Sequence, residues 1–130
     1  MDDIKLPGVI EFYQKKDLGK GRHQTTANLF MMDAEVFETI CMGYIRGEIS
    51  TVESRVGTTI KHPKDKYDKK LAKQAAFKNL KKQRLNILDL TVKNSECSLM
   101  LESGLVIVKR GNRILVYDYS KRYGNFMGAV

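Results

Sequence analysis

Apolar residues recur at helical spacing between Asp33, a residue type suited to cap a helix N-terminus, and Gly47, which favours a helix end. These apolar positions are Val36, Phe37, Ile40, Cys41 and Tyr44, which lie on one side of a helix when each residue turns by about 100°. The pattern therefore predicts a helix over residues 33–47.

The next segment changes from strand-like to helix-like. Residues 48–61 are rich in β-branched side chains around Gly57, which predicts a strand with a bulge or bend at that glycine. His62-Pro63 ends this strand, and Asp65 and Asp68 place two carboxylates where the first turn of a helix needs acceptors. We expect a helix of about five turns that ends near Arg84.

From Leu85 onwards, short apolar runs alternate with turn-forming residues. The runs are 85–93, 97–102, 105–109 and 113–119, and their short connections predict an antiparallel meander. Before the first helix, residues 4–13 favour a short strand interrupted by Pro7-Gly8, and residues 15–26 favour a basic, mobile loop. The predicted fold class is α+β, with two main helices and a meander of about four or five short strands.

The length of 130 residues predicts a single domain over residues 1–130, in which residues 1–26 are partly mobile and residues 120–130 form a last strand or an arm. An apolar fraction of 42% and a charged fraction of 29% are typical of a globular protein. The acidic start Met1-Asp2-Asp3 is unlike a signal peptide, and no apolar run approaches the length of a membrane span. We expect a cytoplasmic protein, in the host cell cytoplasm if it is viral, with no membrane partner.

No residue pattern typical of catalysis or metal binding occurs. Cys41 and Cys97 lack CxxC or Cys/His spacing, and His62 has only His23 as a companion. P-loop and dinucleotide glycine motifs are absent. We therefore expect no catalytic residues, no metal and no cofactor, and a binding protein more readily than an enzyme.

The positive charge is concentrated in one segment. The net charge of the chain is +8, and residues 61–84 carry ten Lys and Arg residues against only Asp65 and Asp68. This segment therefore has as much net positive charge as the whole chain, which indicates a negatively charged partner.

On the predicted helix, Lys66, Lys70, Lys73 and Lys81 fall within an arc of about 80°. Phe77 projects into the middle of this lysine stripe. Lysines that neutralise phosphates, together with a ring that stacks on a base, are typical of single-strand or nucleotide binding. The alternative is an ordinary solvated helix face, with Phe77 packed under a neighbouring loop or subunit.

Two further regions add candidate phosphate contacts. Arg110 and Arg113 flank the Gly111-Asn112 turn, where a hairpin tip can bind phosphates, although a plain solvated turn is the simpler explanation. In the tail, Lys121 and Arg122 alternate with Tyr117, Tyr119, Tyr123 and Phe126. Core packing or subunit exchange explains these aromatic residues at least as well as base stacking.

The run from Gly57 to Leu80, with His62-Pro63, Asp65 and Tyr67-Asp68 before an Ala- and Leu-containing helix, resembles a strand-to-helix motif of small bacteriophage-encoded proteins. The chain departs from that motif at Lys61, where many of those proteins have Cys, and in its many lysines, where they are often acidic. The resemblance implies a phage origin and functions such as counter-defence binding of nucleotide signals or host factors.

The sequence therefore predicts a small, non-enzymatic, basic binding protein that engages nucleic acid or a phosphorylated nucleotide. One alternative is a phage counter-defence or host-takeover protein that inhibits an acidic host protein by direct binding. Another is a virion or assembly component that forms homo-oligomers through its tail.

Overall fold

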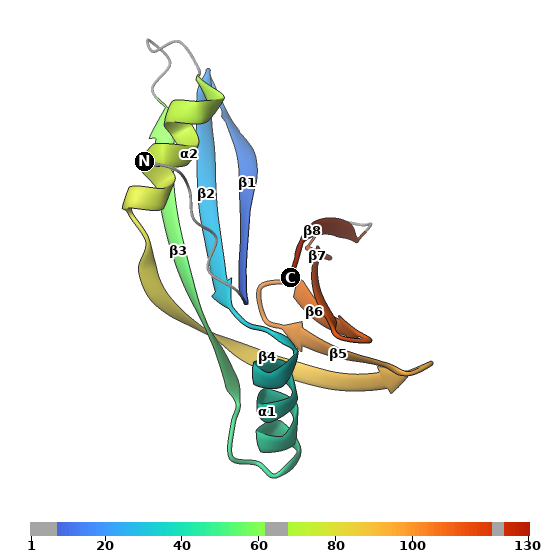
Figure 1. The fold of residues 1–130 in the computed structure, drawn as a ribbon. Helices are drawn as coiled ribbons and strands as arrows, with labels where there is room; N and C mark the ends of the chain where they lie inside the picture. The colour runs from blue at the N-terminus through green and yellow to red at the C-terminus, as the bar shows by residue number, and fades with distance from the viewer. Residues whose placement is uncertain (1–7, 62–67, 121–123) are drawn as a thin grey trace.

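The computed structural model describes residues 8–61, 68–120 and 124–130, which form one eight-stranded antiparallel sheet and two helices (Figure 1). Each strand pairs with the next one along the chain. In chain order the elements are β1 Val9–Gly19, β2 Arg22–Met31, α1 Ala34–Ile45, β3 Thr51–Lys61, α2 Lys69–Lys78, β4 Lys81–Lys93, β5 Glu96–Leu101, β6 Leu105–Arg110, β7 Arg113–Asp118 and β8 Asn125–Ala129.

The first and last strands come back together, so that the sheet forms a nearly closed barrel. A Cβ atom placed on Gly128 of β8 would lie 3.0 Å from Cγ2 of Ile10 on β1. The predicted fold class, α+β with two main helices and a meander of four or five strands, is therefore wrong. The described residues are mostly β, and both helices are short.

The prediction failed first at the N-terminal region. Residues 15–26, predicted as a mobile loop, form the ends of β1 and β2 and the tight turn between them. The turn residues Gly19, Lys20 and Gly21 all have positive φ angles, of 80°, 55° and 76°. The two glycines therefore form a hairpin turn, which needs this backbone conformation, and do not indicate a long loop. Of the predicted strand at residues 4–13, the part before residue 8 lies outside the described residues.

The prediction failed again at the second helix. α2 ends at Lys78, with Asn79 as its C-cap, and residues 81–86 pair with β3 as the start of β4. The lysine-rich sequence has good helix propensity, but pairing with β3 decides its conformation. The pairing of β2 with β3 continues without a break through Gly57, so the predicted bulge there is absent.

Other elements agree with the sequence pattern. α1 begins after Asp33, whose Oδ1 accepts a hydrogen bond from the Val36 amide at 2.9 Å, and Gly47 follows its end with a φ angle of 74°. β5, β6 and β7 form the predicted meander, joined by short turns. The tail contributes β8, which pairs with β7.

The core lies inside the barrel and continues onto α1. Phe12 and Phe30 stack within it, with ring centroids 6.1 Å apart. At one end of the barrel, Phe37 and Cys41 of α1 pack into the same cluster of buried residues (Figure 1). The other ends of β1, β2 and β3 extend beyond the β5–β8 part of the sheet, and α2 lies against them (Figure 1).

Candidate functional site

α2 packs unusually close to the sheet because β3 has a glycine beneath it. A Cβ atom on Gly57 would lie 2.1 Å from the carbonyl oxygen of Ala76, so only glycine fits at this position. Ala76 is fully buried, and the side-chain amide of Asn79 donates to the Thr58 carbonyl oxygen at 3.0 Å. At the start of the helix, Asp68 Oδ1 accepts hydrogen bonds from the amides of Lys70 and Leu71, which confirms its predicted capping role. Asp65 lies outside the described residues.

Lys70, Lys73 and Phe77 lie on one flank of α2, because their spacing of three and four residues matches the helical turn. The Lys73 ammonium lies over the ring of Tyr13 on β1, with 5.0 Å between Nζ and the ring centroid. This flank therefore faces β1. The Phe77 side chain keeps 44% of its surface exposed.

Lys15 lies two residues beyond Tyr13 on the same face of β1, because side chains alternate along a strand. The structure thus brings together two lysines of α2 and one of β1 with two aromatic rings. We call this set the α2–β1 surface; its members are Tyr13, Lys15, Lys70, Lys73 and Phe77.

Lys81 does not belong to this surface. It is the first residue of β4 and pairs with Val56 of β3. Its side chain lies on the same sheet face as Leu85, which is in the core, whereas α2 covers the opposite face at Gly57. The predicted stripe therefore divides: Lys70 and Lys73 lie on one side of the sheet and Lys81 on the other. Lys66, the fourth lysine of the stripe, lies outside the described residues.

Arg110 and Arg113 lie apart from α2, at the turn between β6 and β7 (Figure 1). The Arg110 guanidinium forms an ion pair with Glu96 on β5, and this contact, reinforced by the nearby Tyr117, raises the arginine's pKa. Arg113 pairs with Arg110 across the hairpin and is exposed. The structure therefore does not bring the two arginines together with the lysines of α2.

The aromatic residues of the tail pack against one another. Tyr117 makes an edge-on contact with Phe126 at 5.7 Å between ring centroids and a tilted contact with Tyr119 at 6.3 Å. Tyr119 and Phe126 nevertheless keep 53% and 58% of their surface exposed, so these rings lie on the surface of the protein and not in its core. Lys121 and Arg122 lie outside the described residues.

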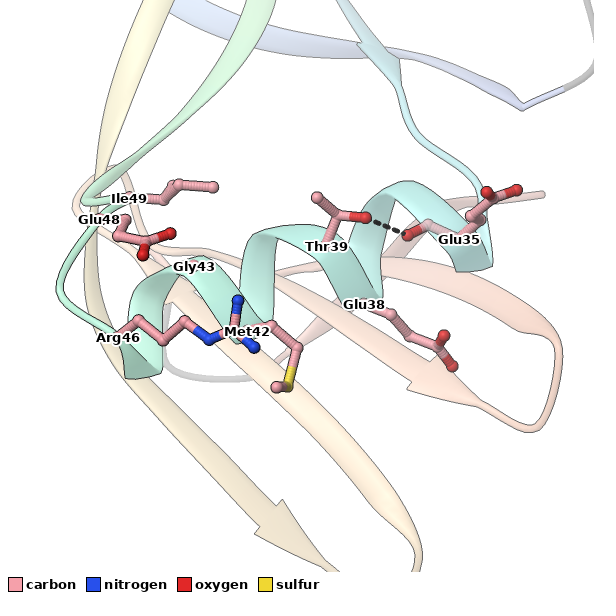
Figure 2. A pocket seen from close by; sticks show the side chains of 8 residues that line it. All are labelled: Glu35, Glu38, Thr39, Met42, Gly43, Arg46, Glu48 and Ile49. Carbon is pink, nitrogen blue, oxygen red and sulfur yellow. Dashed lines mark hydrogen bonds between the residues drawn. The ribbon is translucent and has the colours of Figure 1, made fainter.

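A shallow depression of about 390 Å³ lies along α1 (Figure 2). Its lining includes Glu35, Glu38 and Glu48 together with Arg46 and Met42, none of which was predicted as a site residue. Glu38 forms an ion pair with Lys109 at 3.0 Å, and the Thr39 hydroxyl donates to the Glu35 carbonyl oxygen at 3.1 Å. Its acidic lining makes this depression a poor place for a phosphate.

The described ranges contain no cluster of three or more His, Cys, Asp or Glu side chains that could hold a metal ion. Nor is any helix within them long and apolar enough to cross a membrane. Comparison with known proteins gives no family: no family model, no curated protein and no solved structure matches the chain. The case for function therefore rests on the chain's own residues.

Sequence reasoning missed Tyr13 and Lys15 as members of the site. Residues 9–19 alternate between side chains that point into the barrel and side chains that point out of it. Phe12 lies inside the barrel, and Tyr13 and Lys15 lie outside. The glycines at 19 and 21 hid this strand. No local pattern could show that β1 lies beside α2, because the two elements are about fifty residues apart and meet only through the sheet.

Proposed function

We propose that the chain is a non-enzymatic binding protein that holds single-stranded nucleic acid on the α2–β1 surface. The observation that carries the proposal is the contact of Lys73 with the Tyr13 ring, next to an exposed phenylalanine on the same helix flank. It places cations and aromatic rings from two separate elements in one area.

Each component suits a strand of unpaired nucleotides. Lysines neutralise phosphates and release their counterions, which is the main source of affinity for polyanions. An exposed ring stacks on a base, and such stacking contributes about 1–3 kcal/mol per base. Duplex bases are already stacked on each other, so Phe77 favours a single strand.

The surroundings carry charges of both signs: the Tyr13 hydroxyl donates to the Glu11 carboxylate at 2.7 Å, and several cations lie nearer the hairpin turn. The turn of the β1–β2 hairpin carries Lys20 and Arg22, and its Asp17 uses Oδ1 to accept from the Gly19 amide at 2.8 Å. Across the β2–β3 pair, His23 lies opposite Lys61. An anionic strand approaching α2 therefore meets cations on the neighbouring strands as well.

The proposal is tested by fluorescence anisotropy with a labelled single strand and a labelled duplex of DNA and of RNA. We expect Lys70→Gln and Lys73→Gln to weaken single-strand binding and to reduce the salt dependence of log K by about 0.7 per lost phosphate contact. Phe77→Ala should weaken single-strand binding by about fivefold or more and duplex binding much less.

α2 offers matched controls on its other side. Lys78→Gln removes the same charge, and Leu71→Ala removes an apolar side chain that is 62% exposed. Neither should reduce binding more than about twofold. Absence of binding to any nucleic acid, or equal losses from Leu71→Ala and Phe77→Ala, would refute the proposal. In the first case, nuclease-resistant capture of one acidic protein would identify a protein partner in its place.

A further inference from the structure

The sheet beneath α2 has a second face that continues the barrel interior. On β1 and β2, Phe12 and Phe30 point into the core. Because side chains alternate along a strand, the same face continues beyond the core with Gln14 and Lys16 on β1 and with Thr26 and Gln24 on β2. The polar residues are therefore an extension of the core face toward the hairpin turn.

β3 and β4 supply the other half of this face. Val52 and Leu85 are opposite each other in the core, and two residues further along Ser54 is opposite Gln83. Val56 and Lys81 follow as the next pair on the same side. We name the resulting area the inner sheet face; it consists of Gln14, Lys16, Gln24, Thr26, Thr58, Ile60, Lys81 and Gln83.

The inner sheet face is mostly polar. It contains amides, hydroxyls, two lysines and one isoleucine, and its Gln14 donates a hydrogen bond to the buried carboxylate of Asp118 on β7. Lys16, Lys81 and Gln83 are exposed, and Ile60 keeps 48% of its surface accessible although it is a large apolar residue.

At the inner end of this face, a buried hydroxyl lacks a hydrogen-bond partner. Ser54 is only 2% exposed, and its Oγ has no partner in the described part of the chain. A buried hydroxyl without a hydrogen-bond partner destabilises the folded protein. Its position beside Gln83 is consistent with a polar group that binds at this end of the face.

We propose that the inner sheet face is a second contact surface for the same single strand and the one that distinguishes between bases. This inference rests on the proposed function. The two lysines fit phosphates, and the side-chain amides of Gln24 and Gln83 offer a donor and an acceptor each, the pattern that recognises base edges. The amide of Gln14 is instead bonded to Asn28 and Asp118. The lysines and rings of the α2–β1 surface, by contrast, bind without regard to sequence.

Two neighbouring lysines of β4 provide a matched test. Lys81 lies on the inner sheet face, whereas Lys82 lies on the outer one, where it is 3.9 Å from Glu53. With labelled single strands of each base type, Lys81→Gln should weaken binding about twofold to fivefold, and Lys82→Gln should leave it unchanged. Gln83→Ala should reduce the difference in affinity between base types while changing mean affinity little.

The outcomes separate this inference from the proposed function. If Lys81→Gln and Lys82→Gln have equal effects and Gln83→Ala leaves base preference unchanged, the inner sheet face is not a contact surface. Lys70→Gln would still weaken binding in that case, so the proposed function would survive. If neither Lys70→Gln nor Lys81→Gln weakens binding, both proposals fail.

Discussion

The side-chain amide of Gln14 on β1 donates a hydrogen bond to the carboxylate of Asp118 on β7, with 2.9 Å between Nε2 and Oδ2. The other side of the same amide, Oε1, accepts from Asn28 on β2 at 3.0 Å. Asp118 in turn accepts from the backbone amide and the hydroxyl of Ser120. Asn28 and Asp118 are buried, so Gln14 joins the first strands to the last ones where the barrel closes.

Replacing Gln14 should therefore lower the free energy of unfolding. Gln14→Ala removes a partner from two buried polar groups at once, at a cost of about 1–3 kcal/mol. Urea denaturation measures the change. Gln24→Ala is the control, because Gln24 lies on the same sheet face of the neighbouring strand, and it should change the unfolding free energy by less than about 0.5 kcal/mol. Equal effects would mean that the network does not hold the barrel closed.

Gly57 controls the position of α2. In Gly57→Ala, the new methyl group would lie 2.1 Å from the Ala76 carbonyl oxygen. It would also lie 2.7 Å from the carbonyl carbon of Asn79 and 2.7 Å from the amide nitrogen of Leu80, so the helix must move outward. We expect a loss of about 1–3 kcal/mol in the free energy of unfolding. Single-strand affinity should fall as well, because Lys73 and Phe77 move with the helix.

Thr59→Ala, two residues further along β3, is the control for this substitution. It changes the same sheet face and adds no atom under the helix. Stability by urea denaturation and single-strand affinity by anisotropy are measured on both variants. A Gly57→Ala protein that binds as well as the unchanged chain would show that the α2–β1 surface does not depend on this packing.

Burial raises the pKa of the Cys41 thiol from 9.0 to about 11, and the nearby Cys97 and Glu38 act in the same direction. The unfolded chain therefore loses this proton at lower pH than the folded protein does. The contribution of the protonated Cys41 thiol to the free energy of unfolding is complete below pH 9 and is lost as the pH rises toward 11.

Urea denaturation at about pH 8 and about pH 10 tests this expectation. The unfolding free energy should fall between the two conditions, and it should fall less in Cys41→Ala, which lacks the thiol. The difference in pH dependence between the unchanged chain and Cys41→Ala isolates the contribution of this thiol. Identical pH dependence in both would show that Cys41 is not buried as the structure has it.

The sequence predicted local structure well where local residues determine it. The Asp33 cap and the apolar spacing of Phe37 and Cys41 predicted α1, and the short turns predicted β5 to β7. The sequence-based prediction failed where pairing with a distant strand determines the conformation of a segment. Lys81 and Lys82 continue a helical pattern, yet they pair with Val56 and Arg55 of β3 and form a strand. Strand pairing between distant segments has no signal in a local window of sequence.

The candidate site was predicted in part for the same reason. Lys70, Lys73 and Phe77 share a flank because they lie on one helix, which periodicity shows. Tyr13 joins them through the order of strands β1, β2 and β3, which periodicity does not show. The helix ended earlier than predicted, and this placed Lys81 on the opposite side of the sheet.

The arginines of the β6–β7 turn provide the last prediction. Arg110 is already paired with Glu96, and the turn lies apart from α2, so a strand held on the α2–β1 surface gains little from either arginine. Arg110→Gln and Arg113→Gln should each reduce single-strand affinity by less than about twofold at moderate salt, where distant charges are screened. Lys73→Gln serves as the reference with the same loss of charge. If the arginine variants lose as much affinity as Lys73→Gln, the strand reaches the hairpin turn, and the contact area extends from α2 to the far side of the barrel.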